Sequence, residues 1–149
     1  MVNLDWEKAF DRVDWEFLKK IMTKLGFPKL IINWLMILYT NITSSCIING
    51  NITKEFNIER GVRQGCPLSM LVYVLFQEPL YLAIQQNRKI LAIETPDKES
   101  KTMGYADDTT ICIRDDESLV ETFKVINGFV RASNSKININ PIWFLTTFS

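Results

Sequence analysis

The feature that most constrains the fold is a pair of adjacent aspartates between two short apolar runs. Asp107 and Asp108 lie within GYADDTTICI, residues 104–113. Successive side chains of a regular strand point to opposite faces, so both carboxylates can face the same way only at a tight turn. The apolar flanks, residues 103–105 and 109–113, therefore predict a hairpin with residues 106–108 at its tip.

The charges of these two aspartates require a further explanation. Two carboxylates a few ångströms apart repel by about 4 kcal/mol at an effective dielectric constant near 20, whereas a divalent cation reverses the sign. Alone, the pair is explained simply by aspartate being a common turn residue. Asp5, however, ends another predicted strand at residues 2–5. Three carboxylates that converge at the ends of adjacent strands are hard oxygen ligands suited to Mg²⁺.

The composition narrows the chemistry further. There is no histidine among the 149 residues, which excludes imidazole acid–base catalysis and His-ligated zinc. Seventeen Lys and Arg balance 17 Asp and Glu, so the chain lacks the basic signature of an autonomous nucleic-acid binder. Three widely spaced cysteines, Cys46, Cys66 and Cys112, favour an intracellular compartment, nuclear or cytoplasmic. No apolar run is expected to span a membrane.

Hydrophobic spacing and turn signals predict intermixed helices and hairpins. Helices are expected after Asp14, after Pro28, over residues 68–86 and after Asp115 or Asp116. The second of these is apolar nearly all round and is expected to be well buried. The third is expected to bend at Pro79 and to turn one set of residues inward: Leu71, Val72, Leu75, Phe76, Leu80, Ala83 and Ile84. Strands are expected at residues 45–48 and 52–58 around Asn49-Gly50, and at 90–94, 103–105, 109–113 and 137–140. The irregular order predicts the α+β class, an antiparallel sheet packed on helices.

Three segments resemble, in order, the A, B and C motifs of reverse transcriptases of LINE-type non-LTR retrotransposons. They are LDWEKAFD at residues 4–11, GVRQGCPLS at 61–69 and YADD at 105–108. Met70 departs from the family, which usually has proline there. The resemblance covers residues 3–140 and implies a partial polymerase palm over residues 1–140, lacking complete fingers and thumb. Residues 141–149 are then an unassigned tail.

The resemblance implies a catalytic role for the three aspartates. Asp5, Asp107 and Asp108 would be the metal-binding triad for two Mg²⁺ ions, with Mn²⁺ as an alternative. Two such ions would activate a primer 3′ hydroxyl and stabilise the leaving pyrophosphate. Lys136, within residues 135–138, is similar to a lysine thought to protonate pyrophosphate; a solvated surface lysine is the alternative.

The same resemblance implies a substrate pocket. Phe10 would exclude a 2′ hydroxyl from beneath the sugar, and its alternative is an ordinary core aromatic. Arg63, Gln64 and Gly65 would line the site for the incoming nucleotide and template, where glycine permits close backbone approach; the alternative is a loop with one charge and a turn glycine. Tyr105 would support the aspartate hairpin at the primer end, or be a buried strand tyrosine.

The implied function is that of an RNA-directed DNA polymerase palm, with an RNA template, a DNA primer and dNTPs as partners. Substrate positioning can supply roughly 7 to 11 kcal/mol of a barrier, so without complete fingers and thumb the chain is expected to be weakly active or inactive. Its alternatives are a catalytically silent retrotransposon remnant, an RNA-binding or protein-binding module, and an unrelated two-metal nuclease. The nuclease hypothesis leaves residues 63–65 unexplained.

Overall fold

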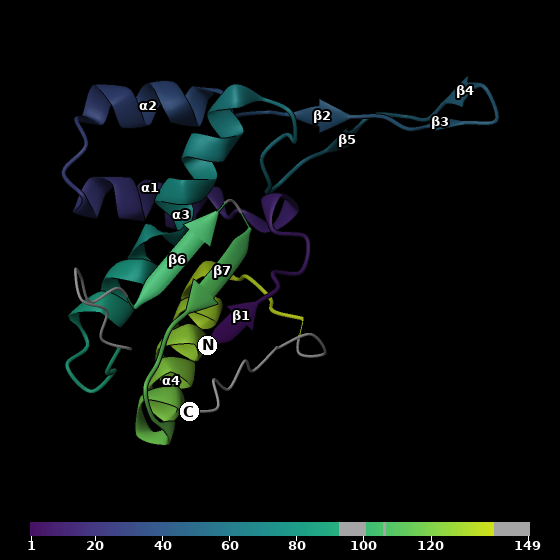
Figure 1. Ribbon diagram of the computed structural model, residues 1–149. Coiled ribbons are helices and arrows are strands. Elements are labelled where there is room, and N and C mark those ends of the chain that lie inside the picture. Colours follow the sequence, from purple (N-terminus) through teal and green to yellow (C-terminus); the bar gives the residue numbers. More distant parts are fainter. Residues whose placement is uncertain (93–100, 106, 139–149) are drawn as a thin grey trace.

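The computed structural model describes residues 1–92, 101–105 and 107–138. Its main sheet has three antiparallel strands, β1 (Val2–Leu4), β7 (Asp108–Ile111) and β6 (Thr102–Tyr105), in the order β1-β7-β6. Helices α3 (Pro67–Gln86) and α4 (Asp116–Ser133) lie behind this sheet in Figure 1. The predicted α+β class, an antiparallel sheet packed on helices, is confirmed.

The two faces of the sheet differ in burial. Val2 and Leu4 of β1 and Thr109 and Ile111 of β7 are all buried, so these alternate residues form the face that packs on the helices. The residues between them point the other way, as the period of a strand requires. Asp108 lies on this second face and is exposed. The sheet therefore has one core face and one open face.

Local sequence signals explain where the helices begin. Asp14 caps α1 (Trp15–Lys24) by accepting a hydrogen bond from Phe17 N, and Asp115 caps α4 in the same way from Ser118 N, each at 2.8 Å. Such caps satisfy N–H groups that have no partner within the helix. Pro67 occupies the first turn of α3, where a missing N–H is tolerated. A short 3₁₀ helix, η1 (Phe10–Arg12), lies between β1 and α1.

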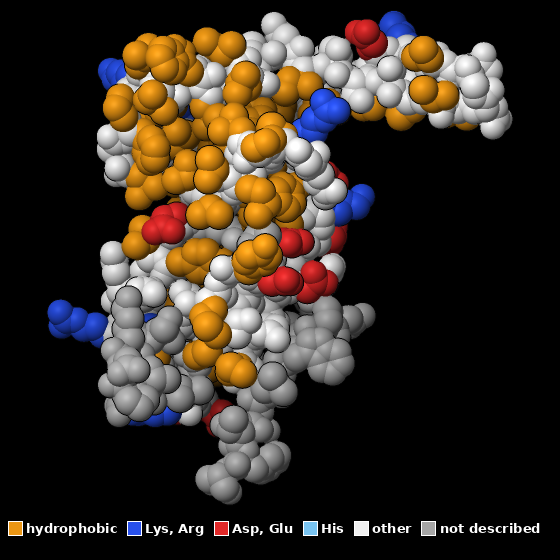
Figure 2. Space-filling view, turned by 45° about the horizontal axis from the view of Figure 1, so that its top comes forward, with side chains coloured by type: hydrophobic (Ala, Val, Ile, Leu, Met, Phe, Trp, Pro, Cys, Tyr) orange, Lys and Arg blue, Asp and Glu red, His pale blue; other side chains and the backbone are white. Residues whose placement is uncertain are grey.

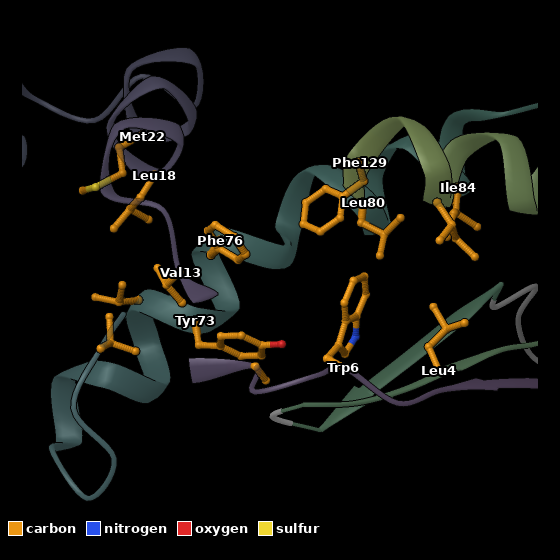
Figure 3. Packing of buried hydrophobic residues seen from close by; sticks show 14 of the residues in the cluster. Leu4, Trp6, Val13, Leu18, Met22, Tyr73, Phe76, Leu80, Ile84 and Phe129 are labelled. Atoms are coloured by element: carbon orange, nitrogen blue, oxygen red, sulfur yellow. The ribbon is translucent and has the colours of Figure 1, made fainter. Parts of the chain in front are cut away.

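Aromatic rings fill the space between the helices and the sheet (Figure 3). Phe17 of α1, Phe76 of α3 and Phe129 of α4 meet edge to face, with ring centroids 5.4, 5.8 and 5.9 Å apart. Trp6 meets Phe129 in the same geometry at 5.7 Å. Edge-to-face pairs contribute about 0.5–1.5 kcal/mol beyond area burial. The cluster thus ties three helices to the residue that follows Asp5.

Helix α3 buries part of the predicted set: Val72, Phe76, Leu80 and Ile84 are buried as expected. Its buried side chains are Ser69, Val72, Tyr73, Phe76, Gln77, Leu80 and Ile84. The expectation that Leu71 and Ala83 point inward is wrong, because both lie off this face and Leu71 is 64% exposed. By length and composition alone α3 is also apolar enough to cross a membrane, contrary to the expectation from the sequence. A core helix passes the same test, and α3 packs on both α1 and α4.

Helix α2 (Lys29–Ile37) is not buried as predicted. Only Ile32 and Leu35 of this helix are buried, whereas Trp34 and Ile37 are 57% and 67% exposed. Apolar residues run nearly all round the helix, but the described part of the chain covers only the side that packs on α1. Apolar side chains accordingly gather on the surface in this region (Figure 2).

A long hairpin projects from the body of the molecule (Figure 1). Its strands β2 (Thr43–Ser44) and β5 (Phe56–Asn57) pair near the base, and β3 (Ile47–Ile48) and β4 (Asn51–Ile52) pair near the tip. Asn49 and Gly50 form the turn with φ values of 50° and 81°, as a type I′ turn requires. The hairpin predicted around Asn49-Gly50 is confirmed; residues 43–57 are called the arm below.

Two other predicted strands differ from the structure or fall partly outside it. Residues 90–92 form no strand. The Leu91 carbonyl instead accepts a hydrogen bond from Arg114 N, and Leu91 N donates one to Ser118 Oγ. Ile137 forms an isolated antiparallel bridge with Trp6. The remainders of these two predictions, residues 93–94 and 139–140, lie outside the described residues, as do Ala106 and the tail 141–149.

Candidate functional site

Two of the predicted site aspartates occupy neighbouring positions at one end of the sheet. In the β1–β7 ladder Val2 pairs with Ile111 and Leu4 with Thr109. Continuing this antiparallel register by one residue places Asp5 opposite Asp108. Residues directly opposite one another in an antiparallel pair project from the same face, with Cβ atoms about 4.5–5.5 Å apart. The fold therefore brings together two residues 103 positions apart in the chain.

A hydrogen bond identifies the face on which this pair lies. Thr110 Oγ1 donates to Asn3 Oδ1 at 2.8 Å, so these two paired residues project from the same side of the sheet. Asp5 follows Asn3 by two residues and Asp108 precedes Thr110 by two, so by the period of two both lie on that same side. The opposite side carries the buried Leu4 and Thr109. Both aspartates thus belong to the open face.

Asp107 lies in the turn between β6 and β7. Tyr105 pairs with Asp108, so residues 106 and 107 form the connection, and Asp108 is the first residue of β7 rather than part of the predicted three-residue tip. Asp107 is exposed. Burial raises the pKa of the Tyr73 hydroxyl, and the negative charge of Asp107 raises it further. The influence of Asp107 thus extends from the turn to α3.

The segment after α4 lies beside the first aspartate motif. Asn138 N donates to Asp5 O at 2.9 Å, and Glu7 N donates to Lys136 O at 3.0 Å. The Asn138 side chain also donates to Asp5 Oδ2 at 2.9 Å. This backbone pairing brings Lys136, predicted from a segment near the other end of the chain, alongside Glu7, two residues from Asp5. The Lys136 side chain is exposed.

Glu7 adds a charge pair next to the aspartates. Its carboxylate accepts a hydrogen bond from Arg12 Nη2, and this bond lowers the pKa of Glu7, with smaller contributions from the charges of Arg12, Lys136 and Lys8. Acidic side chains gather near the middle of the face drawn in Figure 2. Arg12 balances the negative charge of Glu7. The main negative charge of the open face therefore comes from the aspartates.

The donor chemistry of the aspartates and the backbone register fit a divalent cation. Carboxylate oxygens are the ligands that Mg²⁺ and Mn²⁺ accept, and Asn138 occupies only one of the two Asp5 oxygens. In residues 1–92, 101–105 and 107–138, however, no three or more His, Cys, Asp or Glu side chains are gathered around one point as metal ligands. The backbone brings two ligand positions together, whereas the side chains are not converged.

Phe10 lies between the first aspartate motif and α3. Its ring stacks on Tyr73, with centroids 4.8 Å apart and planes 21° apart, and it is half-buried. Its carbonyl accepts a hydrogen bond from Val62 N at 2.9 Å. Phe10 is therefore an aromatic at the edge of the core that keeps part of its surface accessible beside the second motif.

The second motif is held against the first by its leading residues. Gly61 has a φ of +96°, and a Cβ there would lie 3.0 Å from the Asp11 carbonyl oxygen, so glycine permits this close approach. Gly61 O also accepts a hydrogen bond from Trp15 Nε1 at 2.8 Å. Arg63, Gln64 and Gly65, by contrast, are exposed. The loop is anchored beside Phe10, and its three predicted site residues project into solvent.

Tyr105 projects from the open face. It is the β6 partner of Asp108 and is 81% exposed. The alternative that Tyr105 is a buried strand tyrosine is wrong, because the helices cover only the other face of the sheet. Tyr105, Asp108 and Asp5 therefore occupy adjacent positions on three neighbouring strand ends.

Sequence reasoning missed a group of polar side chains behind the aspartates. Trp6, Thr109, Tyr81, Gln77 and Tyr73 form a hydrogen-bonded chain on the core side of the sheet. Figure 3 shows Tyr73 and Trp6 between α3 and the strands. The available signal was the spacing of Tyr73, Gln77 and Tyr81, which recur every four residues along an otherwise apolar helix and so share one face.

Sequence comparisons agree with this arrangement. A family model described as reverse transcriptase (RNA-dependent DNA polymerase) matches residues 1–145. The chain is 32% identical over 137 residues to an uncharacterized 149 kDa protein of transposon TX1 from Xenopus laevis, which covers 92% of this chain and 10% of that protein. It is 22% identical over 138 residues to a retrovirus-related Pol polyprotein of the type-1 retrotransposable element R2 from Popillia japonica, covering 93% and 23%.

The chain thus spans a tenth to a quarter of the length of these two relatives. Both relatives are proteins of non-LTR retrotransposons, as the A, B and C motifs predict, and the matched region includes the sheet, the aspartate hairpin and the 61–69 loop. With its three motifs brought to one end of an antiparallel sheet, the chain belongs to the reverse transcriptase (RNA-dependent DNA polymerase) family.

Proposed function

We propose that this chain is the palm portion of an RNA-directed DNA polymerase. The observation that carries the proposal is the β1–β7 register, which extends to Asp5 opposite Asp108 on the open face. Asp107 lies in the adjoining turn, between Tyr105 and Asp108. This is the arrangement in which three carboxylates from distant parts of the chain can share cations. The length of the relatives, several times that of this chain, supports a role within a larger polymerase.

In this proposal Asp5, Asp107 and Asp108 hold two Mg²⁺ ions, or Mn²⁺ in their place. When bound, such ions would lower the pKa of a primer 3′ hydroxyl and stabilise charge on the leaving pyrophosphate. The chain's own residues would bind and orient the substrate. The carboxylates of the open face would position the 3′ end of the primer, and Asn138, through its bond to Asp5 Oδ2, holds the carboxylate of Asp5 in place.

The surrounding residues are proposed to hold the substrates. Arg63, Gln64 and Gly65 are exposed on a loop anchored beside Phe10, where they would contact the incoming nucleotide and the template. The accessible surface of Phe10, stacked from behind by Tyr73, would exclude a 2′ hydroxyl.

Two further residues have proposed roles at the ends of the reaction. Tyr105, exposed beside Asp108, would support the primer terminus. Lys136, exposed and paired through its backbone with Glu7, would give a proton to pyrophosphate.

Metal binding tests the carboxylate site directly. Titration with Mn²⁺, followed by the electron paramagnetic resonance signal of the free ion, should give a saturable site in the 149-residue chain. Asp108→Asn should weaken the affinity by about fivefold or more, because a contact between unit charges about 4 Å apart is worth between about 1 and 4 kcal/mol across the range from water to a protein surface. Glu55→Gln removes a carboxylate from the arm and should leave the affinity unchanged.

Primer extension tests the reaction. On poly(rA)/oligo(dT) with Mg²⁺ and dTTP, the chain alone is expected to extend weakly or not at all, because positioning by further polymerase segments is worth roughly 7 to 11 kcal/mol. In a longer polymerase that contains this palm, the change Asp107→Ala should abolish extension. Robust extension by the 149-residue chain, lost in Asp107→Ala, would show that it needs no further segments.

A second candidate function, a protein-binding module, is favoured by one observation. The arm exposes Ile47 and Ile52 to 75% and 73%, and α2 exposes Ile37 to 67%. Exposed apolar surface of this extent is typical of interaction sites. Size-exclusion chromatography with light scattering tests whether these surfaces associate. A mass that stays monomeric as the protein concentration is raised would count against this candidate.

A further inference from the structure

A continuous chain of side-chain hydrogen bonds lies directly behind the aspartate end of the sheet. Trp6 Nε1 donates to Thr109 Oγ1 at 3.1 Å, and Thr109 Oγ1 lies 3.1 Å from the Tyr81 hydroxyl. Tyr81 donates to Gln77 Oε1 at 3.0 Å, and Gln77 Nε2 donates to the Tyr73 hydroxyl at 2.9 Å. The chain links the segment after β1, strand β7 and helix α3.

The inventory of donors fixes the direction of this chain. The one hydroxyl proton of Tyr81 goes to Gln77 Oε1, so the Thr109 hydroxyl must donate to Tyr81 and accept from Trp6. The Gln77 amide is then held with its oxygen toward Tyr81 and its nitrogen toward Tyr73. Removing the Thr109 hydroxyl would therefore take one hydrogen bond from Trp6 Nε1 and one from the Tyr81 hydroxyl.

Both ends of the chain reach residues of the proposed site. Trp6 follows Asp5, and Thr109 follows Asp108. Neighbouring strand residues point to opposite faces, so fixing Trp6 and Thr109 on the core side determines where the two carboxylates project on the open side. At the other end, Tyr73 stacks on Phe10. One face of α3 therefore positions parts of the site that come from separate segments.

Gly104 belongs to the same arrangement. It pairs with Thr109 across β6 and β7, and a Cβ at this position would lie 2.2 Å from the Tyr81 hydroxyl oxygen. Glycine at 104 thus leaves room for the Tyr81 hydroxyl beneath β6, where it reaches Thr109. A side chain here would displace that hydroxyl from Thr109 and Gln77.

We propose that Thr109, Tyr81 and Gln77 are positioning residues, which fix the separation of the Asp5 and Asp108 carboxylates and thereby set the affinity of the site for divalent cations. This inference rests on the proposed function, in which those carboxylates are ligands. None of the three residues contacts the open face. They act through Trp6 and through the backbone of β7.

The test compares two threonine-to-valine changes. Thr109→Val keeps the shape of the side chain and removes the hydroxyl that links Trp6 to Tyr81; we expect Mn²⁺ affinity to fall about tenfold, the lower end of the loss seen when groups supporting metal ligands are removed. Thr122→Val is the matched control, because Thr122 is also buried and its hydroxyl donates to Ser118 O within α4 at 2.7 Å. Its Mn²⁺ affinity should be unchanged.

Two further variants keep the test decisive. Thr109→Ser retains the hydroxyl and should bind Mn²⁺ with wild-type affinity. Tyr81→Phe removes the other hydroxyl of the same hydrogen bond and should also weaken Mn²⁺ binding, so it provides the test if Thr109→Val fails to fold. Unchanged affinity in folded Thr109→Val or Tyr81→Phe, with Asp108→Asn still impaired, would overturn the inference and leave the proposed function standing. Wild-type protein that binds no Mn²⁺, or Asp108→Asn that binds normally, would overturn both.

Discussion

Two hairpins of this chain each turn through two residues, but one packs on the core and the other is exposed to solvent. The β6–β7 hairpin packs on α3, buries Thr109 and Ile111, and is paired along its far side with β1. In the arm, all ten residues from 43 to 52 are exposed. An isolated two-stranded hairpin is marginally stable in water. The fold therefore supports the aspartate hairpin from behind and leaves the arm to its local preferences.

The strength of the turn sequence runs the other way. Asn49-Gly50 is the strongest short hairpin signal, whereas Ala106-Asp107 contains no glycine, the residue that primed turns favour most. Packing by α3 and the hydrogen bonds of Thr109 replace that missing preference. A rigid aspartate hairpin suits the positioning of charged ligands, and the apolar residues of the arm suit contact with another surface.

The largest expected difference between the two regions is in the response to truncation of an apolar side chain. Phe76→Ala removes a ring from the cluster behind the sheet and should lower the free energy of unfolding by about 3–5 kcal/mol, as for buried phenylalanines elsewhere. Ile52→Ala in the arm should change it by less than about 0.5 kcal/mol. Urea denaturation followed by circular dichroism measures both. Similar losses in the two variants would contradict the comparison.

Glycine substitutions should separate the hairpins by a smaller margin. Gly104→Ala forces the Tyr81 hydroxyl to move and should cost about 1–3 kcal/mol of global stability, as overpacking does. Gly50→Ala places a side chain at a φ of +81°, which costs about 1–2 kcal/mol locally. Because the arm has no support from the core, that loss should appear as faster amide exchange in residues 43–57 with no change in the global unfolding midpoint.

The smallest expected effect is a pH dependence at the edge of the site. The hydrogen bond from Arg12 lowers the pKa of Glu7 below its ordinary value of 4.5. A lowered pKa contributes stability above that value, and the contribution is lost as the pH falls through the lowered pKa. Glu7→Gln should therefore flatten the fall of the unfolding midpoint as the pH drops below 4.5. Glu55→Gln, the matched change in the arm, should leave the profile unaltered.

Much of the fold could be predicted from the sequence where local signals and tertiary structure agree. Asp14 and Asp115 cap the helices that they were expected to cap, and alternation around the aspartates predicted the β6–β7 hairpin. The burial of α2 could not be predicted, because apolar spacing identifies faces able to pack and does not reveal whether another element covers them. Trp34 and Ile37 are therefore exposed although their side chains are apolar.

The candidate site was predictable to a different extent. Motif order located Asp5 and the aspartate pair, but only the register of β1 against β7 places Asp5 opposite Asp108, since cross-strand pairing depends on the whole sheet. The spacing of Tyr73, Gln77 and Tyr81 places them on one face of a helix, but it does not show which strand that face meets. Tyr81 contacts Thr109, 28 positions away, and Gln77 contacts Tyr81; no local sequence pattern indicates the contact with Thr109.

The most direct test of the central claim, that Asp5 and Asp108 act at one cation site, is a double-mutant cycle in Mn²⁺ affinity. Asp5→Asn, Asp108→Asn and the double variant are titrated alongside wild type and Glu55→Gln. Two ligands of one ion are coupled, so the double variant should lose markedly less affinity than the two single losses combined. Strictly additive losses, or single variants that bind Mn²⁺ as tightly as wild type, would contradict the claim.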